Sequence, residues 1–486
     1  MTPASVILTA LVLPLAGAAA IAACHRLPNL REAVTLTTAS LLFLSVVSLL
    51  PDLLSGAQPA VSVLQVLPGL AVAFAVEPLG MLFALVASGL WIVNSLYSIG
   101  YMRGNGESHQ TRFYVCFALA LASTIGIAFA ANVFTLLLFY ELLTLITYPL
   151  VTHHGDKTAR QGGRTYIALL IGTSVLFLLP ALVFTWFTAG TLDFARGGIL
   201  PPDLGRGTTM LLLALYMFGI GKAALMPFHR WLPAAMVAPT PVSALLHAVA
   251  VVKAGVFSVV KVIVYVFGTD ILAGNTEWLI GAAGFTILAA SAVALHADNL
   301  KRRLAYSTVS QLSYVVLGAA LLAPQSLVGA VLHIAAHALG KITLFFAAGA
   351  IYTASHKTEV SQLDGIGRRM PWTMAAFTIG ALSLIGVPPL VGFVSKWFLM
   401  LGAVGSGQYL AVAVILASTL LNAGYFLPIV YRAFFRAAPA HEHPHGEAPW
   451  PMVVALSATA AGTVAAFFFP EVFLQLARDT AGLEKR

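Results

Sequence analysis

Apolar runs of about 20 residues, long enough to span a bilayer as a helix, recur from one end of this chain to the other. Short segments with glycine, proline or charge separate them. The runs are continuous rather than alternating, which excludes a transmembrane β-barrel. The pattern therefore predicts an all-α polytopic membrane protein.

We expect about fourteen transmembrane helices in a single membrane domain, residues 1–486. Their centres are predicted near residues 14, 43, 91, 121, 142, 175, 216, 254, 286, 311, 340, 387, 422 and 462. Residues 1–111 would hold spans 1 to 3, and residues 450–486 would hold span 14 and a tail. The longer, mixed stretch from Pro51 to Pro78 predicts an irregular hairpin outside the membrane.

The distribution of positive charge predicts how the chain is oriented. One set of alternate connections carries sixteen Lys or Arg residues, whereas the other set and the termini carry five. The positive-inside rule then places the first set in the cytoplasm and both termini outside. The net charge of +8 is thus explained by the basic residues of the cytoplasmic connections. We therefore expect no nucleic-acid partner. We expect a multi-pass protein of the bacterial cell (inner) membrane.

Composition supports this class, because 59% of the residues are hydrophobic and only 9% are charged, too apolar a balance for a soluble fold. Cys24 and Cys116 have no metal-binding spacing, and no nucleotide-binding loop is present. We therefore expect no metal and no cofactor. The segment HEHPHGE (residues 441–447) offers weak metal ligands, but a solvated loop is the preferred interpretation.

Six charged residues are predicted inside spans, where each costs roughly 2.5–3.5 kcal/mol at the bilayer centre. Residues this costly normally face a protein interior or a water-filled path. Glu141 is the one acidic residue expected at mid-span. The five lysines are Lys222, Lys253, Lys261, Lys341 and Lys396.

Lys261, together with His229 and His247, is a possible accessory residue. For Lys261, snorkelling of the long side chain to the outer interface is the favoured alternative. For His247, a hydrogen bond to a neighbouring backbone carbonyl is an equal alternative.

Two spans combine a lysine with a proline break. Pro227 follows Lys222 by five residues, and Pro388 and Pro389 precede Lys396 by seven or eight. Proline interrupts a helix, and broken backbone is tolerated in lipid only where protein or water satisfies it. Such interrupted spans mark the ion path of transporters that are built from inverted repeats.

The interrupted spans are the seventh and the twelfth, five positions apart. This odd offset would invert one repeat relative to the other. It favours two inverted five-helix repeats, spans 4–8 (residues 112–268) and spans 9–13 (residues 275–436).

The segment HIAAHALGKITLFF (residues 333–346) carries three proton-binding side chains four residues apart, His333, His337 and Lys341. This spacing places them on one face of a helix, over roughly 12 Å of its axis. Imidazole titrates near physiological pH, and a desolvated lysine can join it. The pattern predicts a proton relay.

Several long motifs, in order, resemble the antiporter-like subunits shared by Mrp-type multisubunit cation/proton antiporters, respiratory complex I and membrane-bound hydrogenases. They are FYELLTLITYPLV, GIGKAALMPFHRWLP, LKRRLAYSTVSQLSYV, HIAAHALGKITLFF and GVPPLVGFVSKW, within a resemblance that extends from residue 77 to residue 435. The resemblance implies fourteen helices, two inverted five-helix repeats and a polar axis along the middle of the membrane. Lys396, the HxxxHxxxK pattern and the chain length are most similar to the D subunit of Mrp antiporters; the alternative is a subunit of the hydrogenase type.

The resemblance also implies residue roles. The residues that match the family's proton-translocating positions are Glu141, Lys222, Lys253, His333, His337, Lys341 and Lys396. Within this set, Glu141 would pair with Lys222, and Lys396 would lie near the exit of the second half-channel.

The expected function is that of a proton-translocating subunit in a multisubunit monovalent cation (Na⁺ or K⁺)/proton antiporter. The expected partners are other membrane subunits, protons, monovalent cations and the lipid bilayer. The chain would be an ion transporter rather than an enzyme. The alternative is a proton-pumping membrane subunit of a complex I-like or hydrogenase-type redox complex.

Overall fold

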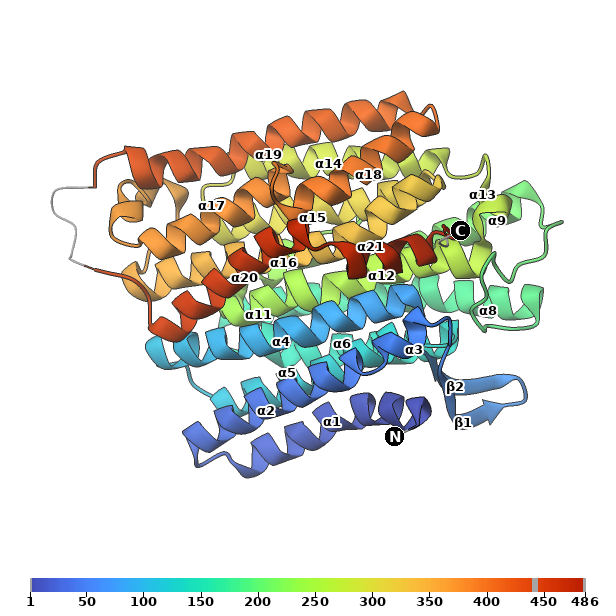
Figure 1. The fold of residues 1–486 in the computed structure, drawn as a ribbon, viewed down its shortest axis with the longest axis horizontal. Helices are drawn as coiled ribbons and strands as arrows, with labels where there is room; N and C mark the ends of the chain where they lie inside the picture. The colour runs from blue at the N-terminus through green and yellow to red at the C-terminus, as the bar shows by residue number, and fades with distance from the viewer. Residues whose placement is uncertain (1, 439–444, 484–486) are drawn as a thin grey trace.

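A computed structural model describes residues 2–438 and 445–483, without the side chain of His247. Its helices lie side by side along one common direction, and the chain advances from α1 at one edge toward α19 at the other (Figure 1). The last helices, α20 and α21, return across the middle, where they pack on α4 and α16. The expected helical membrane class is confirmed.

Ten helical segments of the described residues are long and apolar enough to cross a membrane. They are Pro3–Ala23 (α1), Pro28–Leu54 (α2, Pro28–Val47, and α3, Leu50–Leu54), Pro78–Gly104 (α4), Gln110–Ala128 (α5), Val133–Val151 (α6), Lys157–Ala189 (α7, Lys157–Thr173, η1, Ser174–Leu178, and α8, Leu179–Ala189), Glu277–His296 (α14), Pro324–Ser355 (α16), Tyr409–Phe435 (α19) and Trp450–Phe468 (α20).

The remaining helices are shorter or more polar. They are α9 (Arg206–Gly219), η2 (Gly221–Ala223), α10 (Trp231–Ala234), η3 (Ala235–Val237), α11 (Thr240–Ala244), η4 (Leu245–Val249), α12 (Val251–Val262), η5 (Ile263–Phe267), α13 (Thr269–Leu272), α15 (Leu300–Ala320), η6 (Val360–Gln362), η7 (Ile366–Arg368), α17 (Pro371–Ile385), α18 (Val391–Gly405) and α21 (Glu471–Thr480). The predicted centres near 216, 254, 311 and 387 fall in α9, α12, α15 and the break between α17 and α18. Length and composition therefore do not establish the expected count of fourteen spans.

A hairpin occupies the stretch from Pro51 to Pro78. Strands β1 (Ala60–Leu67) and β2 (Leu70–Ala75) pair antiparallel, with two shifts of register. The hairpin rests on the start of α6, where the Asn132 side chain donates to the carbonyl of Ala71 at 2.9 Å. Both chain ends lie toward the end of the bundle that carries this hairpin (Figure 1).

Both segments that combine lysine and proline are interrupted, as predicted. After α9, the short η2 turn ends at Ala223, and the next residue, Ala224, has a positive φ of 55°. The α17 helix ends before Gly386, whose φ of 94° an L side chain rarely adopts, and α18 begins five residues later. Further irregularities, which the sequence did not predict, are the π-helical turns η1, η4 and η5.

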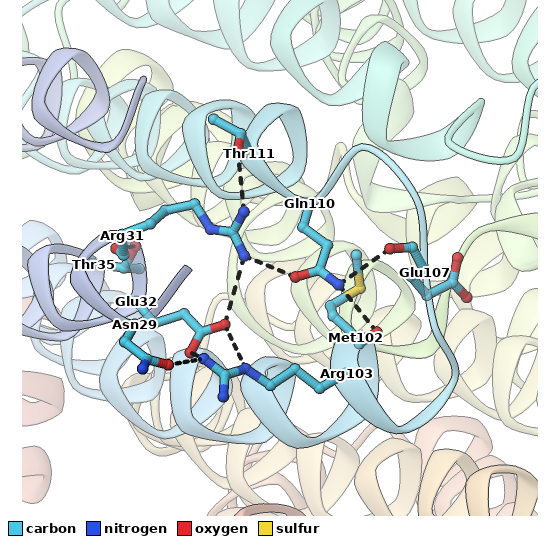
Figure 2. Close-up of polar contacts among 9 residues, drawn as sticks. All are labelled: Asn29, Arg31, Glu32, Thr35, Met102, Arg103, Glu107, Gln110 and Thr111. Atoms are coloured by element: carbon cyan, nitrogen blue, oxygen red, sulfur yellow. Dashed lines mark hydrogen bonds and ion pairs between the residues drawn. The ribbon is translucent and has the colours of Figure 1, made fainter. Parts of the chain in front are cut away.

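A buried ionic cluster joins α2 to α4 and α5 (Figure 2). Arg31 and Glu32, each 4% exposed, begin α2. Arg103 from α4 donates to Glu32 at 2.5 Å, and Arg31 donates to Gln110 of α5 at 2.7 Å. Each buried charge thus has a partner, which is the condition for burying it at acceptable cost.

We expect Glu32→Ala to lower the free energy of unfolding by about 3–5 kcal/mol, because it leaves two arginines without their shared carboxylate. Thermal unfolding of the purified protein in detergent measures this effect. Glu277→Gln, which neutralises an exposed carboxylate in the first turn of α14, is the matched control. Equal melting temperatures for both variants would contradict the prediction.

Candidate functional site

Lys222 lies at the break after α9, fully buried. Its ammonium donates to the Tyr140 carbonyl at 2.7 Å and to the Thr144 hydroxyl at 2.6 Å, and lies 3.1 Å from the centre of the Tyr140 ring. The Tyr140 hydroxyl also accepts from the Lys222 backbone N–H at 3.0 Å. Gly255 of α12 allows this approach, because a Cβ there would collide with the Lys222 carbonyl. One face of α6 therefore holds the lysine.

Glu141 is the residue after Tyr140 on α6. Consecutive helical residues are rotated by roughly 100° about the helix axis, so Glu141 leaves the helix in a different direction from Tyr140. Its two carboxylate oxygens are buried, with no hydrogen-bond partner among the described residues. It borders a groove of about 640 Å³ between α6 and α7, lined by apolar side chains such as Leu137 and Ile171. The expected ion pair between Glu141 and Lys222 is therefore not formed in this structure.

A direct contact between two buried ionisable side chains joins α12 to α16. The Lys253 ammonium of α12 lies 2.6 Å from Nδ1 of His337 in α16. Both residues are at most 1% exposed. Next along α16, the ring of His333 lies 6.1 Å from that of His337, centroid to centroid. The predicted placement of these histidines on one helix face is confirmed.

His333 continues this line toward α18. Its Nε2 lies 3.0 Å from the Gln311 carbonyl oxygen of α15, and its Nδ1 lies 2.9 Å from the Ser395 hydroxyl of α18. Lys396, the next residue, donates to the Ile385 carbonyl at the end of α17 at 3.0 Å. A cation at a helix C-terminus is stabilised by the unpaired carbonyls there.

Lys341 lies one helical turn beyond His337, on the side of α15. Its ammonium donates to the Ser307 hydroxyl at 2.5 Å and to the Leu304 carbonyl at 3.3 Å. It is fully buried. Lys341 is thus a branch beside the line from Lys253 to Lys396 rather than a link within it.

The accessory residues lie elsewhere. Lys261 is fully buried and forms an ion pair with Glu77, the residue before α4, so the snorkelling interpretation is wrong. His229 lies in the turn between η2 and α10, with its ring 6.2 Å from that of Tyr306. The side chain of His247 lies outside the described residues, as does most of the segment 441–447.

Sequence reasoning missed the uncharged partners of these groups. They are Tyr140 and Thr144 beside Lys222, Gln311 and Ser395 beside His333, and Ser307 beside Lys341. The available signal was weak: hydroxyl and amide residues inside apolar runs, of which Gln311 in STVSQLSYV is the clearest.

We name the buried set Lys222, Lys253, His337, His333, Lys341 and Lys396 the polar axis. Neutral lysine and imidazole accept a proton that their charged forms donate, so a row of such groups with hydroxyls between them can pass protons. Within residues 2–438 and 445–483, no group of three His, Cys, Asp or Glu side chains could hold a metal ion. The fold and the axis define a polytopic membrane protein that holds a set of ionisable side chains in its interior.

The family of this protein follows from sequence comparison. Residues 130–434 match the family described as "NADH:quinone oxidoreductase/Mrp antiporter, TM", and the chain belongs to it. It is therefore an antiporter-like membrane subunit of the superfamily that includes complex I, Mrp antiporter and hydrogenase subunits.

Three curated relatives illustrate this range. The chain is 36% identical to NADH-quinone oxidoreductase subunit N of Desulforudis audaxviator, over 75% of this chain and 73% of that protein. It is 34% identical to hydrogenase-4 component B of Escherichia coli, over 70% and 52%. It is 32% identical to a component of the probable K(+)/H(+) antiporter of Rhizobium meliloti, over 76% and 37%. The chain thus spans about half or less of the second and third relatives.

Two solved structures share the fold. A chain of the archaeal membrane-bound sulfane sulfur reductase superposes with a TM-score of 0.87 at 24% identity, covering 98% of this chain and 97% of that one. A chain of the Mrp complex from Dietzia sp. DQ12-45-1b superposes with a TM-score of 0.87 at 22% identity, covering 99% and 97%. At these identities the likeness concerns the fold alone.

Proposed function

We propose that this chain translocates protons along the polar axis, as one subunit of a multisubunit monovalent cation/proton antiporter. The observation that carries the proposal is the contact between Lys253 and His337, which joins the two halves of the molecule through two proton-binding groups. From there the line runs through His333 and Ser395 to Lys396. The family and its K(+)/H(+) antiporter relative support this role.

The proposal includes an architecture of fourteen spans with inverted repeats over residues 112–268 and 275–436. The interruptions beside Lys222 and Lys396, one in each range, support it. The basic connections would face the cytoplasm of a bacterial cell, and both termini would face outside. Residues 1–111 and 450–486 would flank the repeats.

Glu141 and Lys222 would act as the proton-loading pair of the first repeat. Glu141 follows directly on Tyr140, which holds Lys222, so a change of side-chain rotamer would bring the carboxylate and the ammonium together. Pairing would favour protonated Lys222, and separation would release its proton toward Lys253.

The second candidate is a proton-pumping subunit of a redox-driven complex. The relatives from NADH-quinone oxidoreductase and hydrogenase-4 favour it, and its redox centres would lie in other subunits. In either case the chain would work with partner membrane subunits. Among the antiporters, we propose a role similar to that of the Mrp D subunit.

The test is transport by the assembled complex in liposomes. We expect an imposed Na⁺ or K⁺ gradient to drive a change of internal pH, and we expect Glu141→Ala and Lys222→Ala to abolish it. Wild-type pH changes in both variants would contradict the proposal. Proteins that purify with the chain separate the two candidates: iron–sulfur subunits favour the redox complex, and small membrane subunits favour the antiporter.

A further inference from the structure

A cavity of about 270 Å³ opens at the end of the bundle that carries the basic connections. The ends of α4 and α16 and the starts of α11 and α15 enclose it. Its polar lining includes Glu107, His154, Thr240, Lys301, Tyr352 and Thr358. Five segments far apart in sequence thus bring acid, base and hydroxyl groups to one chamber, none of which belongs to the polar axis.

Titratable groups surround the Glu107 carboxylate. It lies 3.6 Å from Nδ1 of His154 and 3.8 Å from Nε2 of His153. Burial raises the pKa of the Glu107 carboxyl above its ordinary value. Burial, with help from Arg112 and His154, lowers the pKa of His153 to about 4. These two shifts bring the pKa of the carboxyl and the pKa of the imidazole closer together, which makes exchange of a proton between the two groups easier.

The elements packed around the cavity add charged or titratable neighbours to Glu107. They are Tyr101 of α4, His109 and Arg112 at the start of α5, His153 and His154 after α6, Lys301 of α15, Tyr352 of α16 and Lys357 just after it. Lys301 donates to the Ala238 carbonyl at 2.6 Å and so ties α15 to the turn before α11.

The cavity lies close to the polar axis. Leu300 and Lys301 line it, and the Leu304 carbonyl, about one turn further along α15, accepts from Lys341. Three to four residues of helix correspond to roughly 5–6 Å of axis. On α16, Ala348 lines the cavity seven residues beyond Lys341, roughly 10 Å along the helix.

Two fully buried polar atoms lie deeper than the cavity, and neither has a hydrogen-bond partner among the described residues. They are the hydroxyl of Ser243, three residues beyond Thr240 on α11, and the carbonyl oxygen of Asn94, seven residues before Tyr101 on α4. The Asn94 amide donates to the Pro241 carbonyl at 3.4 Å, so this side chain lies against α11. Buried polar atoms of this kind are normally satisfied by ordered water.

We propose that this cavity is a proton-access chamber, in which Glu107 and His154 exchange protons with the aqueous phase at the basic end and water beside Asn94 and Ser243 passes them to Lys341. In this proposal Lys341 receives protons from the chamber, which accounts for its position beside the line from Lys253 to Lys396. The inference rests on the proposed function, because it needs protons to move along the axis.

Transport by the assembled complex in liposomes tests the inference, with the pH at the basic end varied. We expect Glu107→Gln to slow proton movement by about tenfold or more, and most strongly at alkaline pH, because a proton-collecting group matters most when protons are scarce. Glu107→Asp should recover most of the rate. Asn94→Leu leaves the lining of the chamber unchanged but removes one of the two deeper polar atoms, and it should reproduce the loss.

Asp364→Asn is the matched control, because it removes a carboxylate that pairs with Arg432 and Arg436 away from the cavity. Wild-type rates and pH profiles in both Glu107→Gln and Asn94→Leu would overturn the inference and leave the proposed function intact. The proposed function fails separately, if Glu141→Ala and Lys222→Ala both retain wild-type transport. Rates are normalised to the amount of assembled complex, so a variant that assembles poorly is not counted as inactive.

Discussion

Lys253→Met is expected to reduce proton movement through the assembled complex by about a hundredfold or more, the range seen when a positioned proton-transfer group is lost. Lys253 makes the direct contact with His337 that joins the two halves of the polar axis. Methionine has a similar length and an apolar chain, so it preserves packing but neither binds nor releases a proton. Transport in liposomes measures the effect.

Two companion variants show whether Lys253 carries a proton or only a charge. Arginine keeps the positive charge but does not release its proton, so Lys253→Arg should be as inactive as Lys253→Met. His337→Gln keeps a polar side chain opposite Lys253 without a group that titrates, and should also be inactive. Full transport by Lys253→Arg would show an electrostatic role and would contradict the relay.

Glu77→Gln is expected to lower the free energy of unfolding by about 3–5 kcal/mol, because it leaves the charge of Lys261 buried without its partner. Lys261 is fully buried among aromatic rings, and those of Phe194 and Tyr265 lie 4.5 and 4.8 Å from its ammonium. These rings compensate a cation only in part. Thermal unfolding in detergent and the amount of protein in the membrane measure the loss.

The double variant Glu77→Gln/Lys261→Met should recover most of this stability, since no buried charge then lacks a partner. Lys261→Met alone should cost less than Glu77→Gln, because the partly accessible Glu77 can take up a proton. Additive losses in the double variant would contradict a pair that acts as one unit.

The hydropathy pattern was enough to predict the membrane class and the positions of the ten long apolar helical segments among the described residues. Charged residues are scarce in the apolar runs, so the few that occur there, Glu141 and the five lysines, stood out in the sequence. They stood out because placing a charge at the bilayer centre costs free energy at any position in the chain. The spacing of His333, His337 and Lys341 predicted one helix face correctly, since all three lie on the unbroken helix α16. These are local properties of the chain, which composition and the helical repeat of the sequence are enough to predict.

The residues on other helices that hold each buried charge could not be predicted from these local properties. From the sequence, Glu141 was the expected partner of Lys222, whereas Tyr140 and Thr144 hold it, because helix rotation decides which of several neighbouring residues faces a partner. Lys261 was expected to reach the interface, whereas Glu77, 184 residues away in the chain, pairs with it in the interior. The local sequence pattern shows which charged side chains are too costly to expose to lipid. The packing of helices that are distant in the chain determines which groups stabilise those charges.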